Sequence, residues 1–218
     1  MARALAAEPR LFTHATIVTV SEAVGGLILA GAAAFGFAVA AAHSRFLDRV
    51  LTPLVIVSQT VPVITLAPLL VLWFGYGALP RVVVCALVAF FPMAVSALQG
   101  FRSTDPDLLL LLVSVNASRW DTFWRARLPY AGPFLMGGLR TGMTLSLVGA
   151  VVAEWTGSGQ GLGYIVLSAN SRLATAQAFA AVAIISALGL ASYWCAGLLE
   201  RRIGWWKRTE PRPGRMDQ

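Results

Sequence analysis

Residues 103–129, STDPDLLLLLVSVNASRWDTFWRARLP, decide the fold of this chain, because they form a charged and aromatic segment between two long apolar runs. Before them, Val82–Phe101 contains no Asp, Glu, Lys or Arg, and after them Tyr130–Trp155 is interrupted in its middle only by Arg140. A hydrocarbon core about 30 Å thick is crossed by about 20 apolar residues of helix. The sequence therefore predicts two membrane spans joined by an ordered loop.

The composition excludes a soluble domain. Of the 218 residues, 57% are apolar and 12% are charged, whereas soluble chains have about 45–50% apolar and about 25% charged residues. The net charge is +7. In a soluble chain this would favour nucleic-acid binding, but here the cations lie beside apolar runs, as in membrane proteins whose basic loops set the orientation. We expect a lipid bilayer and no nucleic acid as partner.

Apolar runs elsewhere in the chain predict three more spans. The five predicted spans are Thr16–Ala42, Pro53–Phe74, Val82–Phe101, Tyr130–Trp155 and Ala176–Leu199. The predicted fold class is all-α: a polytopic transmembrane helical bundle that forms one domain, residues 1–205, followed by a polar tail, residues 206–218.

Arginines cluster between residues 102 and 127 and again in the tail after residue 200. Short segments rich in Lys and Arg stay on the cytoplasmic side, so both clusters and the C-terminus are predicted to be cytoplasmic. Five spans then place the N-terminus outside, where Arg3 and Arg10 violate the same rule.

Local signals predict that the loop, residues 103–127, folds as a helix–turn–helix. Asp105 ahead of Pro106 is typical of an N-cap followed by proline at the first helical position. Asn116 tolerates a left-handed C-cap. Ser118, with Asp121 three residues later, resembles a capping box for a second helix.

Trp120, Phe123 and Trp124 follow helical spacing and predict an aromatic face on the second helix, opposite an arginine face. Leu128–Pro129 is expected to end this unit and lead into the next span. Two interpretations stay open on the residues alone. The loop is an amphipathic element that rests on the lipid headgroups, or it is a docking surface for a cytoplasmic partner.

Ionisable residues within a membrane span cost free energy to insert, so they are candidates for a functional role. Arg140 is predicted near mid-membrane, where insertion of an arginine costs at least about 2.5 kcal/mol. It is either a pathway or gating residue or a structural anchor to a neighbouring helix. Glu154 and Glu22 are predicted near the outer ends of their spans. Solvation at the interface is the simple explanation, which we favour for Glu22, whereas Glu154 is a candidate for an outer gate or a contact to a binding protein.

Polar and small residues also mark two of the spans. Gln59, Thr60 and Pro62 interrupt an otherwise apolar run, and they either line a pathway or form a packed kink. Gly138 and Gly142 form a G-x-x-x-G pattern, which favours close helix approach.

The 103–129 stretch and the sequence after it resemble the permeases of binding-protein-dependent ABC importers, in the branch for nitrate, sulfonate, taurine and thiamine-precursor uptake. That family has a cytoplasmic motif: E-A-A, three residues, G, nine residues, then I-x-L-P. Further resemblances follow in order: VPVITLAPLLVLWFGYG (61–77), FFPMAVSALQGFRS (90–103), AEW (153–155) and LERR (199–202). Together they cover roughly residues 13–205.

This sequence departs from the family motif at three positions. With the motif anchored on Leu128–Pro129, Leu110 stands in place of the glutamate, Asn116 in place of the glycine and Ala126 in place of the isoleucine. Leu110 removes a carboxylate that could pair with a basic residue of an ATPase. The family also usually has a further span ahead of Thr16–Ala42, so we expect a truncated or misassigned start, with a true five-span form as the alternative.

The resemblance implies a transport subunit that is not itself an enzyme. Its implied partners are a dimer of cytoplasmic ABC ATPases, a second permease copy (a homodimer) and an extracytoplasmic substrate-binding protein. It also implies a coupling role for these residues of the loop and the step after it: Asp107, Leu110, Asn116, Ala117, Ser118, Arg119, Trp120, Asp121, Phe123, Arg125 and Pro129. The pathway or gate candidates are Gln59, Thr60, Pro62, Arg140 and Glu154.

We expect this chain to bind no cofactor or metal, with ATP and Mg²⁺ used by the partner ATPase. It has no G-x-x-x-x-G-K-[ST] motif, and its one lysine is Lys207. A sulfonate, nitrate, taurine or vitamin-precursor pyrimidine is the expected substrate class, with a slight preference for the last. The alternatives are a secondary transporter, disfavoured because no internal repeat is evident, and a membrane scaffold without transport.

Overall fold

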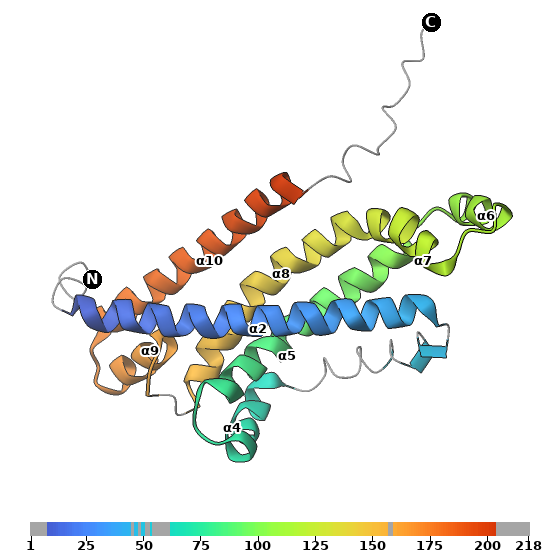
Figure 1. Ribbon diagram of the computed structural model, residues 1–218. Helices are drawn as coiled ribbons and strands as arrows, with labels where there is room; N and C mark the ends of the chain where they lie inside the picture. Colours follow the sequence, from blue (N-terminus) through green and yellow to red (C-terminus); the bar gives the residue numbers. More distant parts are fainter. Residues whose placement is uncertain are drawn as a thin grey trace, which may run out of the picture.

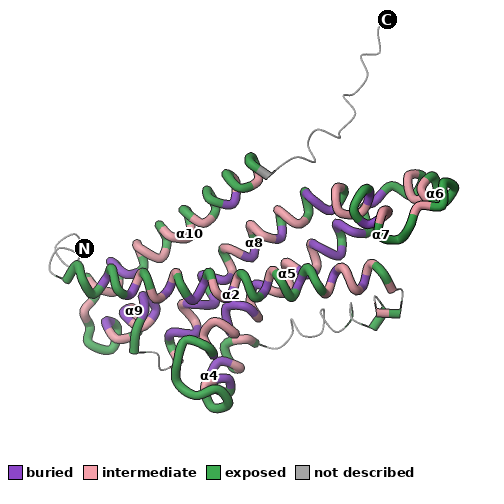
Figure 2. Tube along the Cα trace, in the orientation of Figure 1, coloured by how far each residue is buried: buried purple, intermediate pink, exposed green. Residues whose placement is uncertain are grey.

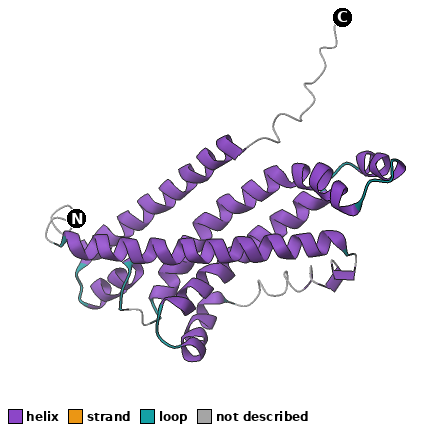
Figure 3. Cartoon of the chain, viewed as in Figure 1, coloured by secondary structure: helices purple, strands orange, loops and turns teal. Residues whose placement is uncertain are grey.

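The computed structural model describes residues 8–44, 46–47, 49–50, 53, 62–156 and 159–203. In these residues the regular structure is helical throughout (Figures 1 and 3). The principal elements are α2 (Pro9–His43), α4 (Val63–Phe74), α5 (Ala78–Arg102), α6 (Pro106–Ser114), α7 (Arg119–Thr122), the π-helical η1 (Phe123–Arg127), α8 (Leu128–Glu154), α9 (Leu162–Ser171) and α10 (Thr175–Ile203).

Four helical stretches of the described chain are long and apolar enough to cross a bilayer. They are Pro9–His43, Ala78–Arg102, Arg119–Glu154 and Thr175–Arg202. The predicted all-α membrane protein is thereby confirmed. Of the remaining predicted span, Pro53–Phe74, the structure describes residues 53 and 62–74, most of which form α4. The 12 residues of α4 extend about 18 Å. Its full crossing, and with it the count of five, stays a prediction.

The core is formed by α2, α5 and α8, which pack against one another through small residues. A Cβ atom added to Gly138 would lie 2.9 Å from the Cβ of Ser96, and one added to Gly142 would lie 2.8 Å from the Cγ of Met93. The predicted close approach at this G-x-x-x-G pattern is therefore confirmed. In a membrane, close backbone contact is a principal source of helix association.

The two ends of the bundle carry different structures. Figure 1 shows α6 and α7 at one end of α8 and α9 at the opposite end. The helix α10 packs on α9 and α8, but among the described residues most of its length is exposed or half-buried rather than buried (Figure 2). Large apolar side chains are exposed along it: Phe179, Val182, Leu190, Trp194 and Leu198.

Candidate functional site: the helix–turn–helix loop and the outer polar cluster

The first helix of the loop, α6, begins as the sequence predicts. The carboxylate of Asp105 accepts a hydrogen bond from the backbone N–H of Asp107 at 2.8 Å, which satisfies one of the free donors of the first turn. Asp107 itself is exposed. The helix presents apolar side chains outward, each at least 60% exposed: Leu110, Leu111 and Val113. An exposed apolar surface of this kind indicates a contact with another molecule.

The turn after α6 is a Schellman motif with asparagine at its left-handed position. Asn116 has φ +54°, and its N–H donates to the carbonyl of Val113 at 3.0 Å. The N–H of Ala117 donates to the carbonyl of Leu112 at 2.9 Å. These are the two bonds that close a helix end of this type, so the predicted C-cap at Asn116 is confirmed.

The predicted N-cap at the second helix is also present, and the Ser118 hydroxyl donates to the Asp121 carboxylate. The Oγ of Ser118 accepts from the N–H of Asp121 at 3.0 Å and lies 2.5 Å from its carboxylate oxygen. Arg125 pairs with Asp121 at 3.7 Å with both side chains substantially exposed, which contributes little to stability. Arg119 and Arg125 both face solvent, as the predicted arginine face requires.

The expected end of this unit at Leu128–Pro129 is wrong. Residues from Arg119 to Glu154 form one continuous helical stretch through α7, η1 and α8. In η1 the N–H of Leu128 donates to the carbonyl of Phe123, five residues back. Proline has no N–H and its ring crowds the carbonyl of the preceding turn. A wider π turn ahead of Pro129 accommodates both effects, so the helix continues.

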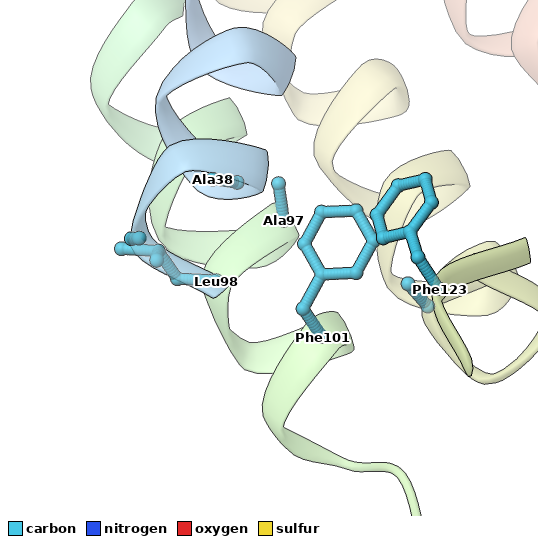
Figure 4. Close-up of a cluster of buried hydrophobic side chains, with 7 residues drawn as sticks. Ala38, Ala97, Leu98, Phe101 and Phe123 are labelled. Carbon is cyan, nitrogen blue, oxygen red and sulfur yellow. The ribbon is translucent and has the colours of Figure 1, made fainter. Parts of the chain in front are cut away.

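The aromatic face is divided between the bundle and solvent. Phe123 is 3% exposed, whereas Trp120 and Trp124 are 63% and 51% exposed. The Phe123 ring lies 5.4 Å from that of Phe101 on α5 (Figure 4) and 5.5 Å from that of His43 on α2. Spacing alone placed the three rings on one face. The structure uses Phe123 to anchor the loop and leaves the two tryptophans available.

A second anchor and a hollow lie beside Phe123. The guanidinium of Arg127 donates to the backbone carbonyl of Ala42 at the end of α2. A hollow of about 440 Å³ opens between α2 and the loop. Its lining includes His43, Leu109, Val113, Ala117, Arg119 and Thr122. The loop is thus held to the bundle at its base while its tip is free to meet a partner.

The pathway candidates are not gathered at one point. Gln59 and Thr60 lie outside the described residues. Pro62 is exposed and precedes the first residue of α4 as its N-cap, so it does not kink that helix. The guanidinium carbon of Arg140 lies 4.4 Å from the ring centroid of Tyr193 on α10. This cation–π contact ties α8 to α10.

Interfacial solvation is the wrong explanation for both glutamates. Glu22 is 2% exposed and Glu154 is fully buried. Glu22 forms an ion pair with Arg81 at 2.6 Å. Glu154 accepts hydrogen bonds from the hydroxyl of Thr19 and from the N–H of Gly163, both at 2.5 Å. Because its carboxylate is enclosed, Glu154 presents no surface to a binding protein in this conformation.

Sequence reasoning missed Thr19 and Arg81 as members of this outer polar cluster. One signal was available: Thr19 and Glu22 are three residues apart, so they share one face of a helix. The partners of that face come from α5, α8 and α9, and no local pattern identifies them. Among the described residues, no three His, Cys, Asp or Glu side chains gather into a possible metal site.

The chain belongs to the family of binding-protein-dependent transport system inner membrane components, whose model matches residues 32–205. It is accordingly a permease subunit of a binding-protein-dependent ABC importer, a multi-pass inner-membrane component without catalytic activity of its own. A system of this type implies an ATPase and a binding protein as partners.

Three similar proteins are consistent with this family assignment. The chain is 37% identical to a probable ABC transporter permease protein of Haemophilus influenzae, over 92% of this chain and 84% of that protein. It is 37% identical to the riboflavin transport system permease protein of Chloroflexus aurantiacus, over 91% and 74% of the two chains. A formylaminopyrimidine transport permease protein of Halalkalibacterium halodurans is 35% identical, over 75% and 65%.

A solved structure shows the same fold. It is described as the crystal structure of an amino acid ABC transporter with histidines, and it superposes with a TM-score of 0.74 at 16% identity. The superposition covers 91% of this chain and 97% of the other.

Proposed function

We propose that this permease forms half of a translocation pathway with a second copy of itself and that residues 103–127 are the surface on which the ATPase docks. The observation that carries the proposal is the structure of the loop. It is a capped helix–turn–helix that Phe123 and Arg127 fix to the bundle, and its first helix, α6, exposes apolar side chains. Burial of Leu110 and Val113 would stabilise a protein contact, whereas lipid binding would not require so rigid a turn.

The orientation follows from this assignment, and the proposal keeps the predicted count of five spans. With the loop and the C-terminus in the cytoplasm, α9 lies at the outer face, at the other end of α8 (Figure 1). The remaining predicted crossing passes through Pro53–Phe74, and Gln59, Thr60 and Pro62 stay predicted pathway residues. Arg140 is proposed as the anchor between α8 and α10 because its guanidinium already has an aromatic partner in this chain.

The second copy is proposed to cover part of the exposed surface of α10. Only 6% of the apolar window of this helix is buried, and its large side chains would gain contacts against another permease. A homodimer is the simplest assembly that pairs two coupling loops with two ATPases.

For the substrate, we propose a small nitrogen heterocycle of the vitamin-precursor type. The support is that relatives named for riboflavin and formylaminopyrimidine transport are 37% and 35% identical, whereas those named for taurine and for aliphatic sulfonates are 33% and 30% identical. Cellular uptake of radiolabelled formylaminopyrimidine, riboflavin and taurine tests this. Uptake of taurine alone would contradict it.

Replacement of an exposed apolar residue on α6 tests the docking surface. Val113→Asp or the charge reversal Arg119→Glu should lower co-purification of the ATPase by at least about tenfold, the scale of a residue central to an interface. The matched control is Leu173→Asp, because Leu173 is 84% exposed at the opposite end of the molecule. Wild-type recovery of the ATPase with Val113→Asp, in correctly inserted protein, would contradict the assignment.

A further inference from the structure

The last residue of α8, Glu154, is enclosed by a separate helix. Its carboxylate accepts from the N–H of Gly163 in the first turn of α9. The hydroxyl of Thr19 on α2 donates to the other carboxylate oxygen, and the N–H of Leu162 approaches the same hydroxyl oxygen at 3.0 Å. We call these four residues, Thr19, Glu154, Leu162 and Gly163, the α9 clasp. It joins three helices through bonds between residues as far apart as 143 positions.

The backbone of the α8–α9 connection is shaped around this carboxylate. Gly161 has φ +99°, and a Cβ atom there would overlap the carboxylate of Glu154; a Cβ atom at Gly163 would meet the carbonyl oxygen of Val151 and then this carboxylate, at 2.5 and 2.9 Å. Any other residue at either position would displace Glu154 or α9. A carboxylate at the N-terminus of a helix is favoured by the free N–H groups and by the helix dipole, so Glu154 fixes where α9 begins.

Glu154 is also the last residue of the continuous helical stretch that begins in the coupling loop at Arg119. The stretch Arg119–Glu154 is helical throughout, so its 36 residues form a rod of about 54 Å. One end carries the loop proposed to meet the ATPase, and the other carries the carboxylate that holds α9. A movement of the loop along or about this rod displaces Glu154 and, through the clasp, α9.

A second tie lies three residues along α2 from Thr19. Glu22 pairs with Arg81, and the Nε of Arg81 donates to the carbonyl of Gly77 at 2.9 Å. Arg81 thereby fixes the α4–α5 turn to the same turn of α2 that holds Thr19. The outer ends of α5, α8 and α9 are thus fastened to one segment of α2, residues 19–22.

We infer that Glu154 is a positioning residue for transport: it fastens α9 to the end of the α7–η1–α8 rod, so that the coupling loop and the outer face change conformation together. This inference rests on the proposed function, because it takes the loop as the ATPase contact.

The test uses the complete complex in lipid nanodiscs and four variants. Thr19→Val removes the clasp hydroxyl while keeping the shape of the side chain. Its matched control is Thr16→Val, because Thr16 is on the same helix and, among the described residues, its hydroxyl bonds only to the Phe12 carbonyl of that helix. Glu154→Ala removes the carboxylate, and Glu154→Gln keeps the shape and one acceptor oxygen.

Two measurements separate positioning from folding. Hydrogen–deuterium exchange of residues 159–166 reports the clasp, and the ratio of binding-protein-stimulated to basal ATP hydrolysis reports coupling. Thr19→Val and Glu154→Ala should speed exchange in this segment by about tenfold or more, the scale of a lost charge-assisted hydrogen bond, and should lower the stimulation ratio. Thr16→Val should change neither, and Glu154→Gln should recover part of both.

Unchanged exchange in Glu154→Ala would overturn the clasp, and faster exchange with an unchanged stimulation ratio would overturn the coupling role. Either result leaves the permease assignment intact as long as the ATPase still co-purifies. Failure of ATPase docking in the wild-type complex would instead overturn the proposed function. If Glu154→Ala does not assemble, Thr19→Val still decides the outcome.

Discussion

The two ends of the α7–η1–α8 rod are constructed by opposite means. The coupling loop is shaped by hydrogen bonds between residues no more than five positions apart, at Asp105, Asn116 and Ser118. The outer end depends in addition on bonds between residues more than 50 positions apart, such as Thr19 with Glu154 and Glu22 with Arg81. The caps of the loop therefore need no distant partner, whereas the outer cluster requires α2, α5, α8 and α9 to be packed together.

The two ends also differ in what they expose. The loop presents Leu110, Trp120 and Trp124 to the surroundings, while Glu22 and Glu154 are almost fully buried. An exposed apolar surface suits reversible contact with a partner. A buried charge that is paired or hydrogen-bonded holds the helices around it in one geometry, because loss of its partner would cost several kcal/mol. Substitutions at the outer end should therefore cost more stability than those in the loop.

The largest expected effect is the loss of one partner of the buried ion pair. Arg81→Leu should lower the free energy of unfolding by about 3–5 kcal/mol, because it leaves the Glu22 carboxylate buried without its cation. The double variant Glu22→Leu with Arg81→Leu should recover most of this loss. SDS-induced unfolding of the purified protein in mixed micelles measures both. If the double variant is as unstable as the single one, the charge is not the cause.

An intermediate effect is expected in the α8–α9 connection. Gly161→Ala should lower the free energy of unfolding by about 1–3 kcal/mol from overpacking, in addition to the strain of its left-handed backbone, since the new methyl group meets Glu154. The matched control is Gly159→Ala, because Gly159 also has positive φ, +63°, but no atom within 4 Å of an added Cβ. Equal destabilisation in the same unfolding assay would show that backbone strain alone is responsible.

The smallest effect is expected at the cap of the loop. Ser118→Ala should cost about 1 kcal/mol, confined to the first turn of α7, and should weaken ATPase co-purification while global unfolding stays near wild type. Ser114→Ala is the control, since that exposed hydroxyl bonds only to the carbonyl of Leu111. A global loss of stability in Ser118→Ala would show that the loop is not the independent unit described above.

The helical membrane class and the caps of the loop were predictable from the sequence. The N-cap at Asp105, the left-handed Asn116 and the N-cap at Ser118 each involve a few neighbouring residues, so residue type and spacing are sufficient. The end predicted at Leu128–Pro129 was wrong because proline is unfavourable in a helix interior on average, and no local pattern of residues signals the π turn that accommodates it.

The role of Glu154 could not be predicted. Its position near a span end is compatible with solvation, a gate or a partner contact, and the choice depends on α2 and α9 closing around it. Phe123 shows the same limit: its spacing with Trp120 and Trp124 was evident, but Phe101 and His43, which bury it, come from other helices.

The sequence by itself determined that this chain crosses a membrane as helices and that a structured, arginine-bearing loop interrupts them, because hydrophobic length and capping act over one or a few turns. Only the tertiary structure decided that the loop and α8 are one rod and that the glutamate at its far end holds α9. Those features depend on which helix faces meet, because a polar group is stable in the interior only where other segments supply its hydrogen-bond partners.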